Sequence, residues 1–404
     1  MKDPLGDAPR VDSRRAILGV SVAIALFVVL IFVRPSMAMT IAIAIGLIFT
    51  IMLHEAGHLI AAKRGGMKAT EFFVGFGPRL WSFRRGETEY GIKAIPAGGY
   101  VRVIGMTNLE EVEPEDEART YRSAPYKRKM VMILAGVTVN LLLAYLFTFA
   151  ILVGRGQDSV STRVGSVSVE SPAQVAGMKP GDRVLSIGGV EISDWDQVSP
   201  LVRKAAGKPI EIEVERDGAT KVLVATPEVI DGVVRIGITA SIETNRVPVV
   251  TAVGRSATVI VTGAGQTVTA LGDIVSPSGV SKYTKTVTSP GAKGGFSGNE
   301  RPRSVIGIVA DGGSLVGNDF WGLLGLLAAI NVFLALFNLI PLLPFDGGHA
   351  VVATFEAAAS KIRGRRVVID QRHLFPVTAV VIVMLLMLGL STMYLDLRSI
   401  VSGT

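Results

Sequence analysis

The chain has 404 residues, of which 49% are hydrophobic and only 19% are charged. Because a soluble domain of this size carries about 25% charged residues, this composition argues against an ordinary cytosolic enzyme. The sequence contains no cysteine, which excludes disulfides, thiolate nucleophiles and sulfur-ligated metal sites. The net charge of +7 comes from Lys and Arg scattered beside apolar runs. No aromatic-interleaved basic domain accompanies them, so we expect no nucleic-acid partner.

Five apolar runs are long enough to cross a bilayer, for which a helix needs about 20 residues. They are residues 16–33, 38–62, 130–153, 321–340 and 374–395. Basic residues flank one set of their ends, and the positive-inside rule therefore predicts a cytoplasmic N-terminus and a C-terminus outside. The first run leads into Arg34-Pro35 without a small-residue cleavage site, which favours a helical hairpin over a secretory signal.

The cytoplasmic segment between the second and third runs combines glycine with β-forming residues at positions 71–78 and 98–102. Short strands with glycine turns predict a small hairpin sheet close to the membrane. The acidic run at 110–117 is interpreted as a solvated loop.

The only large polar block, residues 160–245, lies on the outer side and reads as short strands joined by turns, with a hairpin signal at Asp217-Gly218. Apolar residues at helical spacing in 252–276 predict an amphipathic helix. This helix either packs against the polar block or serves as an interfacial helix or substrate clamp. Residues 276–303, rich in Ser, Gly, Pro and Lys, predict a flexible linker.

The second run contains the sequence His54-Glu55-Ala56-Gly57-His58. Residues four apart lie on one face of a helix, so both imidazoles can bind one metal ion. Glu55 lies between them and can act as general base toward a metal-bound water. Ionisable residues inside a membrane are costly, about 2.5–3.5 kcal/mol each, which makes a purely structural histidine pair an unlikely alternative.

A zinc site with two histidines needs a third protein ligand and an open position for water. With cysteine absent, Asp346 is the better candidate; its alternative role is a turn residue before Gly347. Pro341 and Pro344 break the fourth run, so a loop can bend back toward the metal. His349 is interpreted as supporting or structural, and His373 as a surface residue.

Asn338 ends the fourth run at a depth similar to that of His54. His54 lies 16 residues after Ala38 and Asn338 lies 17 residues after Trp321. At 1.5 Å per residue, both are about 24–26 Å from the outer end of their helices. Asn338 can hold a substrate backbone or an oxyanion, or alternatively make an interhelical hydrogen bond.

Together these residues resemble the site-2 protease family of zinc intramembrane metalloproteases, and most closely its bacterial branch in regulated intramembrane proteolysis. The matching motifs are His54–His58, the Gly75-Phe76-Gly77-Pro78 and Gly98-Gly99-Tyr100 segments, and residues 338–348. The block 160–245 resembles a PDZ domain through Ser171-Pro172-Ala173 and residues 176–182. The resemblance covers most of residues 38–395.

The resemblance implies a polytopic α-helical membrane protein with about five transmembrane helices and a three-helix catalytic core formed by runs two, three and four. It adds a membrane-associated β-hairpin element and one extracytoplasmic PDZ-like α+β domain. The implied divisions are an extra N-terminal helix (1–37), the first part of the core (38–155), the PDZ-like domain (160–245), the amphipathic helix and linker (246–319), and the second part of the core with the C-terminal helix (320–404).

The resemblance further implies that His54, His58 and Asp346 bind zinc. Glu55 would be catalytic and Asn338 would position the substrate. The implied substrates are single-span proteins of a bacterial cell membrane, cut within or near their transmembrane segments after an upstream site-1 protease trims their outer part. Anti-sigma factors and signal-peptide remnants are examples. The PDZ-like domain would filter substrates by size or bind the freshly cut end.

The chain departs from the family pattern in three places. The run 16–33 precedes the usual first core helix, Phe345 stands where many members have leucine, and a second PDZ domain is absent. Two other functions remain open. A membrane scaffold with a vestigial metal site predicts that Glu55→Gln leaves function in cells intact. A metal transporter would need several polar helices, whereas runs one and five carry almost no polar groups.

Overall fold

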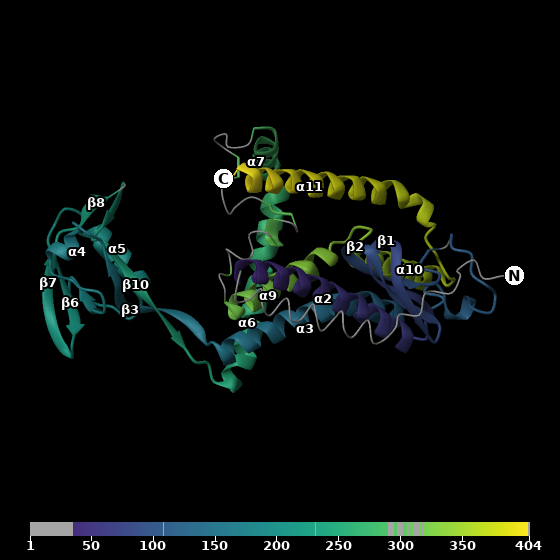
Figure 1. Ribbon diagram of the computed structural model, residues 1–404, viewed down its shortest axis with the longest axis horizontal. Helices are drawn as coiled ribbons and strands as arrows, with labels where there is room; N and C mark the ends of the chain where they lie inside the picture. The colour runs from purple at the N-terminus through teal and green to yellow at the C-terminus, as the bar shows by residue number, and fades with distance from the viewer. Residues whose placement is uncertain are drawn as a thin grey trace. The chain divides into compact units, whose positions relative to one another are not determined.

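The computed structural model describes residues 35–402, apart from residues 108, 231, 290–294, 297–301, 305–306, 310–315 and 317–318. It divides into two compact units (Figure 1). The helical unit comprises the described residues up to Phe149 and from Val253 onward, and the sheet unit comprises Ala150–Ala252. The predicted run 16–33 lies outside the described residues.

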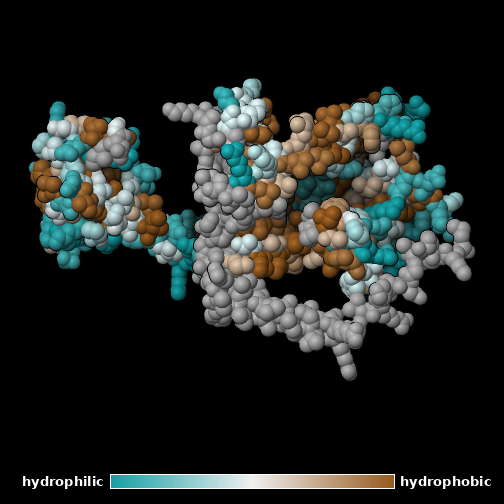
Figure 2. All heavy atoms as spheres, turned by 45° about the horizontal axis from the view of Figure 1, so that its top comes forward, coloured by the Kyte–Doolittle hydropathy of each residue, from teal (hydrophilic) through white to brown (hydrophobic). Residues whose placement is uncertain are grey.

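Four long apolar helices confirm the other predicted runs. They are α2 (Pro35–Arg64), α3 (Tyr126–Gly154), α9 (Phe320–Asn338) and α11 (Phe375–Ser402). Each contains a stretch long and apolar enough to cross a membrane. Hydrophobic side chains cover much of the helical unit in Figure 2, and hydrophilic ones gather at the end that carries the β1–β2 hairpin. The chain is therefore a multi-pass membrane protein.

Helix α6 (Val249–Val275) confirms the predicted helix after the polar block and runs crosswise to α2, α3 and α9 in Figure 1. It is also long and apolar enough to be a candidate span. Its apolar side chains are largely exposed, for example Val261 and Val268. The hydroxyl of Tyr145 on α3 donates to the carbonyl of Val253 at 3.1 Å, which ties the start of α6 to the helical unit.

The prediction of a flexible linker at 276–303 is wrong in its first part, which forms α7 (Pro277–Thr288). Ser276 caps this helix by accepting a hydrogen bond from the N–H of Gly279 at 3.0 Å, and Pro277 occupies the first helical position. Tyr283 contacts Ser391 of α11 through their hydroxyls at 2.6 Å. A cap, a proline and a tertiary contact thus outweigh a composition typical of linkers.

Strands β1 (Ala69–Arg85) and β2 (Thr88–Val103) form the predicted hairpin sheet. Residues 71–74 of β1 are flanked on both sides, by residues 99–102 and by residues 89–92 of β2. The base of the hairpin packs on α2, α3 and α10 (Asp346–Arg363) through a buried cluster that includes Met67, Val103 and Ile133. Residues 99–101 are therefore held beside α2.

The acidic run before α3 is not simply a solvated loop, although Glu111, Glu113 and Glu115 are exposed. Other acids around the short helix η1 (Glu117–Arg119) form ion pairs. The pairs are Lys68–Asp116, Arg102–Glu110 and Arg122–Glu117. Lys68 reaches the run from 48 residues away, and Arg102 and Arg122 reach it from its two sides, which a local count of acidic charges does not reveal.

The sheet unit contains a sheet with strand order β10-β3-β4-β6-β7, in which β5 also pairs with β4, and a separate β8–β9 pair. The strands are β3 (Gln157–Val167), β4 (Arg183–Ile187), β5 (Val190–Glu191), β6 (Ile210–Arg216), β7 (Ala219–Ala225), β8 (Glu228–Ile230), β9 (Val233–Arg235) and β10 (Ile238–Asn245). The helices are α4 (Pro172–Val175), η2 (Trp195–Gln197) and α5 (Val198–Lys204). Val164, Val184 and Ile212 lie in its buried core.

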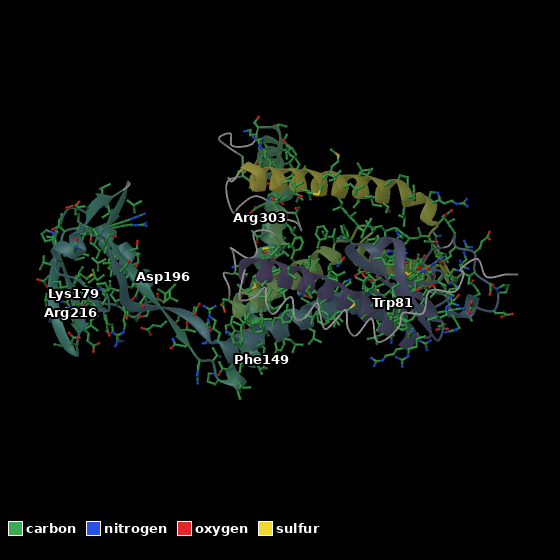
Figure 3. All side chains as sticks on the ribbon, in the orientation of Figure 1. Trp81, Phe149, Lys179, Asp196, Arg216 and Arg303 are labelled. Atoms are coloured by element: carbon green, nitrogen blue, oxygen red, sulfur yellow. The ribbon has the colours of Figure 1, made fainter. Side chains whose placement is uncertain are left out.

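Two local features hold the sheet unit together. Asp217 and Gly218 have positive φ angles of 55° and 77° and join β6 to β7 in a tight turn, which confirms the predicted hairpin. The carboxylate of Asp182 is 1% exposed and pairs with Arg216 through hydrogen bonds of 2.7 Å to Nε and Nη2. The Lys179 N–H donates to the same carboxylate at 2.8 Å. Lys179 and Arg216 lie close together in this unit (Figure 3).

Candidate metal centre

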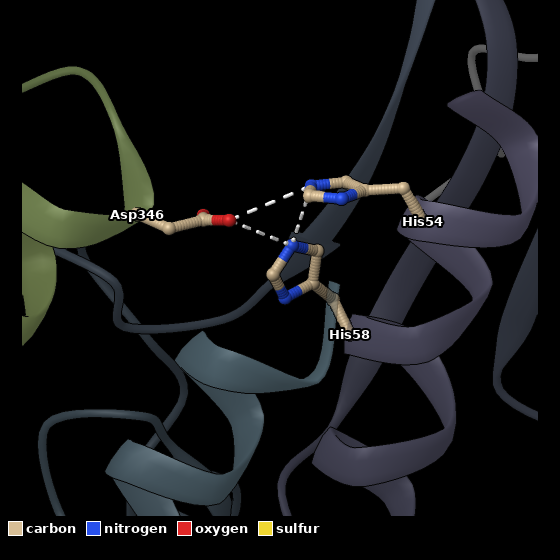
Figure 4. A group of neighbouring side chains, drawn as sticks. All are labelled: His54, His58 and Asp346. Carbon is tan, nitrogen blue, oxygen red and sulfur yellow. Dashed lines mark hydrogen bonds and ion pairs between the residues drawn. The ribbon is translucent and has the colours of Figure 1, made fainter. Parts of the chain in front are cut away.

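His54 and His58 lie on one face of α2, as their spacing predicts, and both are buried, at 7% and 6% exposure. Their Nε2 atoms lie 3.1 Å apart (Figure 4). Two imidazoles four residues apart on an apolar helix thus present two nitrogens to one point.

Asp346 meets these nitrogens from the other end of the sequence. Its Oδ2 lies 3.5 Å from Nε2 of His54 and 3.3 Å from Nε2 of His58. Asp346 begins α10 after the loop that follows α9. A Cβ on Gly347 would lie 2.3 Å from the carbonyl oxygen of Leu339, and one on Gly348 would lie 2.4 Å from the carbonyl carbon of Leu342. Only glycine at both positions lets α10 start so close to this loop.

The three atoms fit a metal ion. Ligands at about 2.0–2.2 Å from a tetrahedral zinc lie about 3.3–3.5 Å from one another, close to the 3.1, 3.3 and 3.5 Å found here. Oδ2 of Asp346 is buried without a hydrogen-bond partner among the described residues, so a metal would satisfy it. Burial disfavours the charged carboxyl, but the two imidazoles hold the pKa of Asp346 below its usual range. The donor set of two imidazole nitrogens and one carboxylate oxygen is that of catalytic zinc sites.

Helix α3 supports His58 through residues that sequence reasoning missed. The carbonyl of Met132 accepts a hydrogen bond of 2.8 Å from Nδ1 of His58, which leaves the Nε2 lone pair free for a metal. A Cβ on Gly136 would lie 2.4 Å from Nε2 of His58 and 2.5 Å from Cε1 of His54. The backbone of α3 thus touches both rings, and no short-range signal in the sequence indicates this contact.

Glu55 lies between α2 and the hairpin. Its carboxylate lies near the backbone of Val101 in β2. A Cβ on Gly99 would lie 3.3 Å from Cγ of Glu55, so β2 passes directly against this side chain. The glycine-rich segment noted in the sequence is therefore part of the same site.

The remaining candidates lie outside the three-atom group. Asn338 is the half-buried last residue of α9, at the start of the loop that leads to Asp346. His349 is not part of the three-atom group and lines a small cavity with Lys129 and Glu356. His373 is exposed in the short helix η4 (Gln371–His373). The positioning role of Asn338 stays a prediction.

Comparison with known proteins places the chain in a family. The model of peptidase family M50 matches residues 42–386. Zinc metalloprotease Rip1 of Mycobacterium tuberculosis is 33% identical over 401 residues, which cover 88% of this chain and 96% of the relative. A putative zinc metalloprotease of Nostoc is 31% identical over 345 residues, covering 80% and 88%. The chain belongs to peptidase family M50, the site-2 protease family, and is a zinc metalloprotease.

Proposed function

We propose that this M50 peptidase is an intramembrane endopeptidase that cuts single-span membrane proteins within or near their transmembrane segments. The observation that carries the proposal is the meeting of His54, His58 and Asp346 inside an apolar helical unit, with Glu55 beside them. A centre built on membrane-spanning helices acts on bonds that a soluble protease cannot reach.

In this proposal His54, His58 and Asp346 hold the zinc ion. Zinc supplies Lewis-acid polarisation of the scissile carbonyl and of the attacking water. Glu55 accepts a proton from that water on its carboxylate and then donates it to the nitrogen of the leaving amine, so that one proton moves from water to product for each bond cut. Asn338, which lies at a depth in the membrane similar to that of His54, holds the substrate backbone.

The hairpin suggests how the substrate is presented. A helical transmembrane segment hides its carbonyls in its own hydrogen bonds and must be extended before it can be cut. Residues 99–101 of β2 pass against Glu55, and an extended substrate segment running beside them would bring its carbonyl to the metal. A strand next to the general base supports this mode of binding.

The positions of basic residues support an orientation with the N-terminus in the cytoplasm and the sheet unit outside. Lys63 and Arg64 end α2, and Lys127, Arg128 and Lys129 lie in the first turn of α3. In this orientation the metal centre faces the cytoplasmic side. The sheet unit would be a PDZ-like domain that filters or binds substrates already trimmed by a site-1 protease, such as anti-sigma factors or signal-peptide remnants.

The test is cleavage of a trimmed single-span substrate in zinc-supplemented liposomes by wild type and by Glu55→Gln. The control is Glu111→Gln, which changes an exposed acid in the loop before α3. We expect Glu55→Gln to keep its zinc and lose at least about 100-fold in rate, the lower end of the range for a general base. Glu111→Gln should cleave like wild type. Full activity of Glu55→Gln would refute the mechanism, and intact function of that variant in cells would favour a scaffold.

A further inference from the structure

Unsatisfied buried polar atoms lie on three membrane-spanning helices, one of which carries the metal-site histidines. Among the described residues, five buried side-chain atoms lack a hydrogen-bond partner: Nδ1 of His54, Nδ2 and Oδ1 of Asn140, Oδ1 of Asn331, and Oδ2 of Asp346. A metal ion accounts for Asp346. The other four atoms lie on α2, α3 and α9, in membrane-spanning segments where no bulk water can satisfy them.

The contacts between α2 and α3 place Asn140 one helical turn beyond the residue that touches His54. Met132 is bonded to His58, and Gly136, four residues later, touches both His58 and His54. The two helices run in opposite directions, so moving one turn forward along α3 corresponds to moving one turn back along α2. Asn140, one turn after Gly136, therefore lies between the levels of His54 and Thr50. Asn140 is fully buried, at 0% exposure, and lies on the same face of α3 as Gly136.

The contacts between α2 and α9 bring Asn331 to a neighbouring level. A Cβ on Gly46 would lie 2.9 Å from Leu327, and four residues later Thr50 accepts a long hydrogen bond of 3.5 Å from Nδ2 of Asn331. Thr50 lies one turn before His54 on α2. Asn331, also at 0% exposure, leaves its Oδ1 unpartnered at this level.

The unpartnered atoms are complementary. A metal on Nε2 of His54 places the ring proton on Nδ1 and makes it a donor that needs an acceptor. We propose that Asn140 is the positioning residue for His54. In the zinc-loaded protein its side chain turns so that its Oδ1 accepts the Nδ1–H of His54 and its Nδ2 donates to Oδ1 of Asn331, two bonds that are not formed in the structure described here. All four atoms are then satisfied, because two donors meet two acceptors.

Helix α3 would then hold both histidines, with the Met132 carbonyl on His58 and the Asn140 amide on His54. Such partners fix the tautomer and the orientation of a ligand, and their loss typically weakens metal binding 10–100-fold. The inference rests on the proposed metal site but assigns a role to a residue outside it.

The experiment measures zinc affinity in detergent by competition with a chelator of known affinity, for wild type, Asn140→Leu, Asn140→Asp and Thr148→Val. The last variant replaces another buried polar side chain of α3, three turns from Gly136. We expect Asn140→Leu to bind zinc about 10–100-fold more weakly. Asn140→Asp keeps an acceptor oxygen and should stay within about threefold of wild type, and Thr148→Val should match wild type. Melting of the zinc-free proteins should be similar for all four.

Equal zinc affinity of Asn140→Leu and wild type would overturn the inference alone, as would an equal loss in Thr148→Val or in Asn140→Asp. Wild type that binds no zinc would overturn the metal site and this inference together. If Asn140→Leu does not fold, NMR of the histidine ring nitrogens in zinc-loaded wild type and Asn140→Asp tests the inference instead. The Nδ1–H signal of His54 should shift downfield in Asn140→Asp relative to wild type, and an unchanged signal would overturn the inference.

Discussion

Replacing Gly136 by alanine should damage the metal centre without unfolding the helical unit. The new Cβ would lie 2.4 Å from Nε2 of His58, 2.5 Å from Cε1 of His54 and 2.7 Å from its Nε2. Ordinary van der Waals contact begins at 3.4 Å, so the rings or the helices must move by about 1 Å. Zinc ligands tolerate distance errors of only about 0.2 Å.

A displacement of about 1 Å costs on the order of 100-fold in catalysis, and we expect zinc affinity to fall by at least about tenfold. The apoprotein should be far less affected. Overpacking costs about 1–3 kcal/mol, and the higher helix propensity of alanine offsets up to about 1 kcal/mol of it.

The assays are zinc competition with a chelator and cleavage of a trimmed membrane substrate in liposomes. The melting temperature of each zinc-free variant shows whether a loss comes from the metal centre or from unfolding. The matched control is Gly389→Ala on α11, another glycine in a membrane-spanning helix, whose added Cβ would meet nothing within 4 Å. Wild-type zinc affinity in Gly136→Ala would refute the reasoning, as would an equal loss in Gly389→Ala.

Two further predictions concern the metal ligand set and the sheet unit. Asp346→Ala should lower the zinc content of the purified protein from about one per chain to near zero, whereas His349→Gln should retain it. Metal analysis of both variants tests this. Zinc retained in Asp346→Ala would show that Asp346 does not share a metal site with the two histidines. Burial opposes the charge of Asp182, but the hydrogen bonds from Arg216 and Lys179 hold its pKa below the usual value. The stability that this carboxylate contributes is therefore present above about pH 4, the unfolded pKa, and is lost as pH falls through the lower folded pKa. Asp182→Asn should destabilise the sheet unit by about 3 kcal/mol at neutral pH and flatten its acid unfolding profile; an unchanged profile by circular dichroism would contradict the assignment.

Several features follow from the sequence because they depend only on nearby residues. Apolar runs predict α2, α3, α9 and α11, since about 20 apolar residues have no stable alternative to a membrane helix. The spacing of His54 and His58 puts two nitrogens at one point on a single helix, and Asp217-Gly218 supplies the positive φ angles of a tight turn. The proline-broken segment before Asp346 indicated a returning loop, and the structure brings that residue to the histidines.

Other features depend on which helices pack together, and no local pattern specifies that. Lys68 pairs with Asp116 of the acidic run across 48 residues of sequence, and α7 formed where composition predicted a linker. Gly136 and Asn140 drew no notice in the sequence, because a glycine and an asparagine in an apolar helix look alike whether they face lipid or a metal site. Their importance arises from the contact of α3 with α2. Because Gly136 has no side chain, the backbone of α3 reaches both imidazoles, and the buried amide of Asn140 needs a hydrogen-bond partner. Local sequence patterns specify the four long apolar helices and one pair of ligands, because these depend on neighbouring residues. The packing of the helices brings together the distant groups that complete the metal centre and support it.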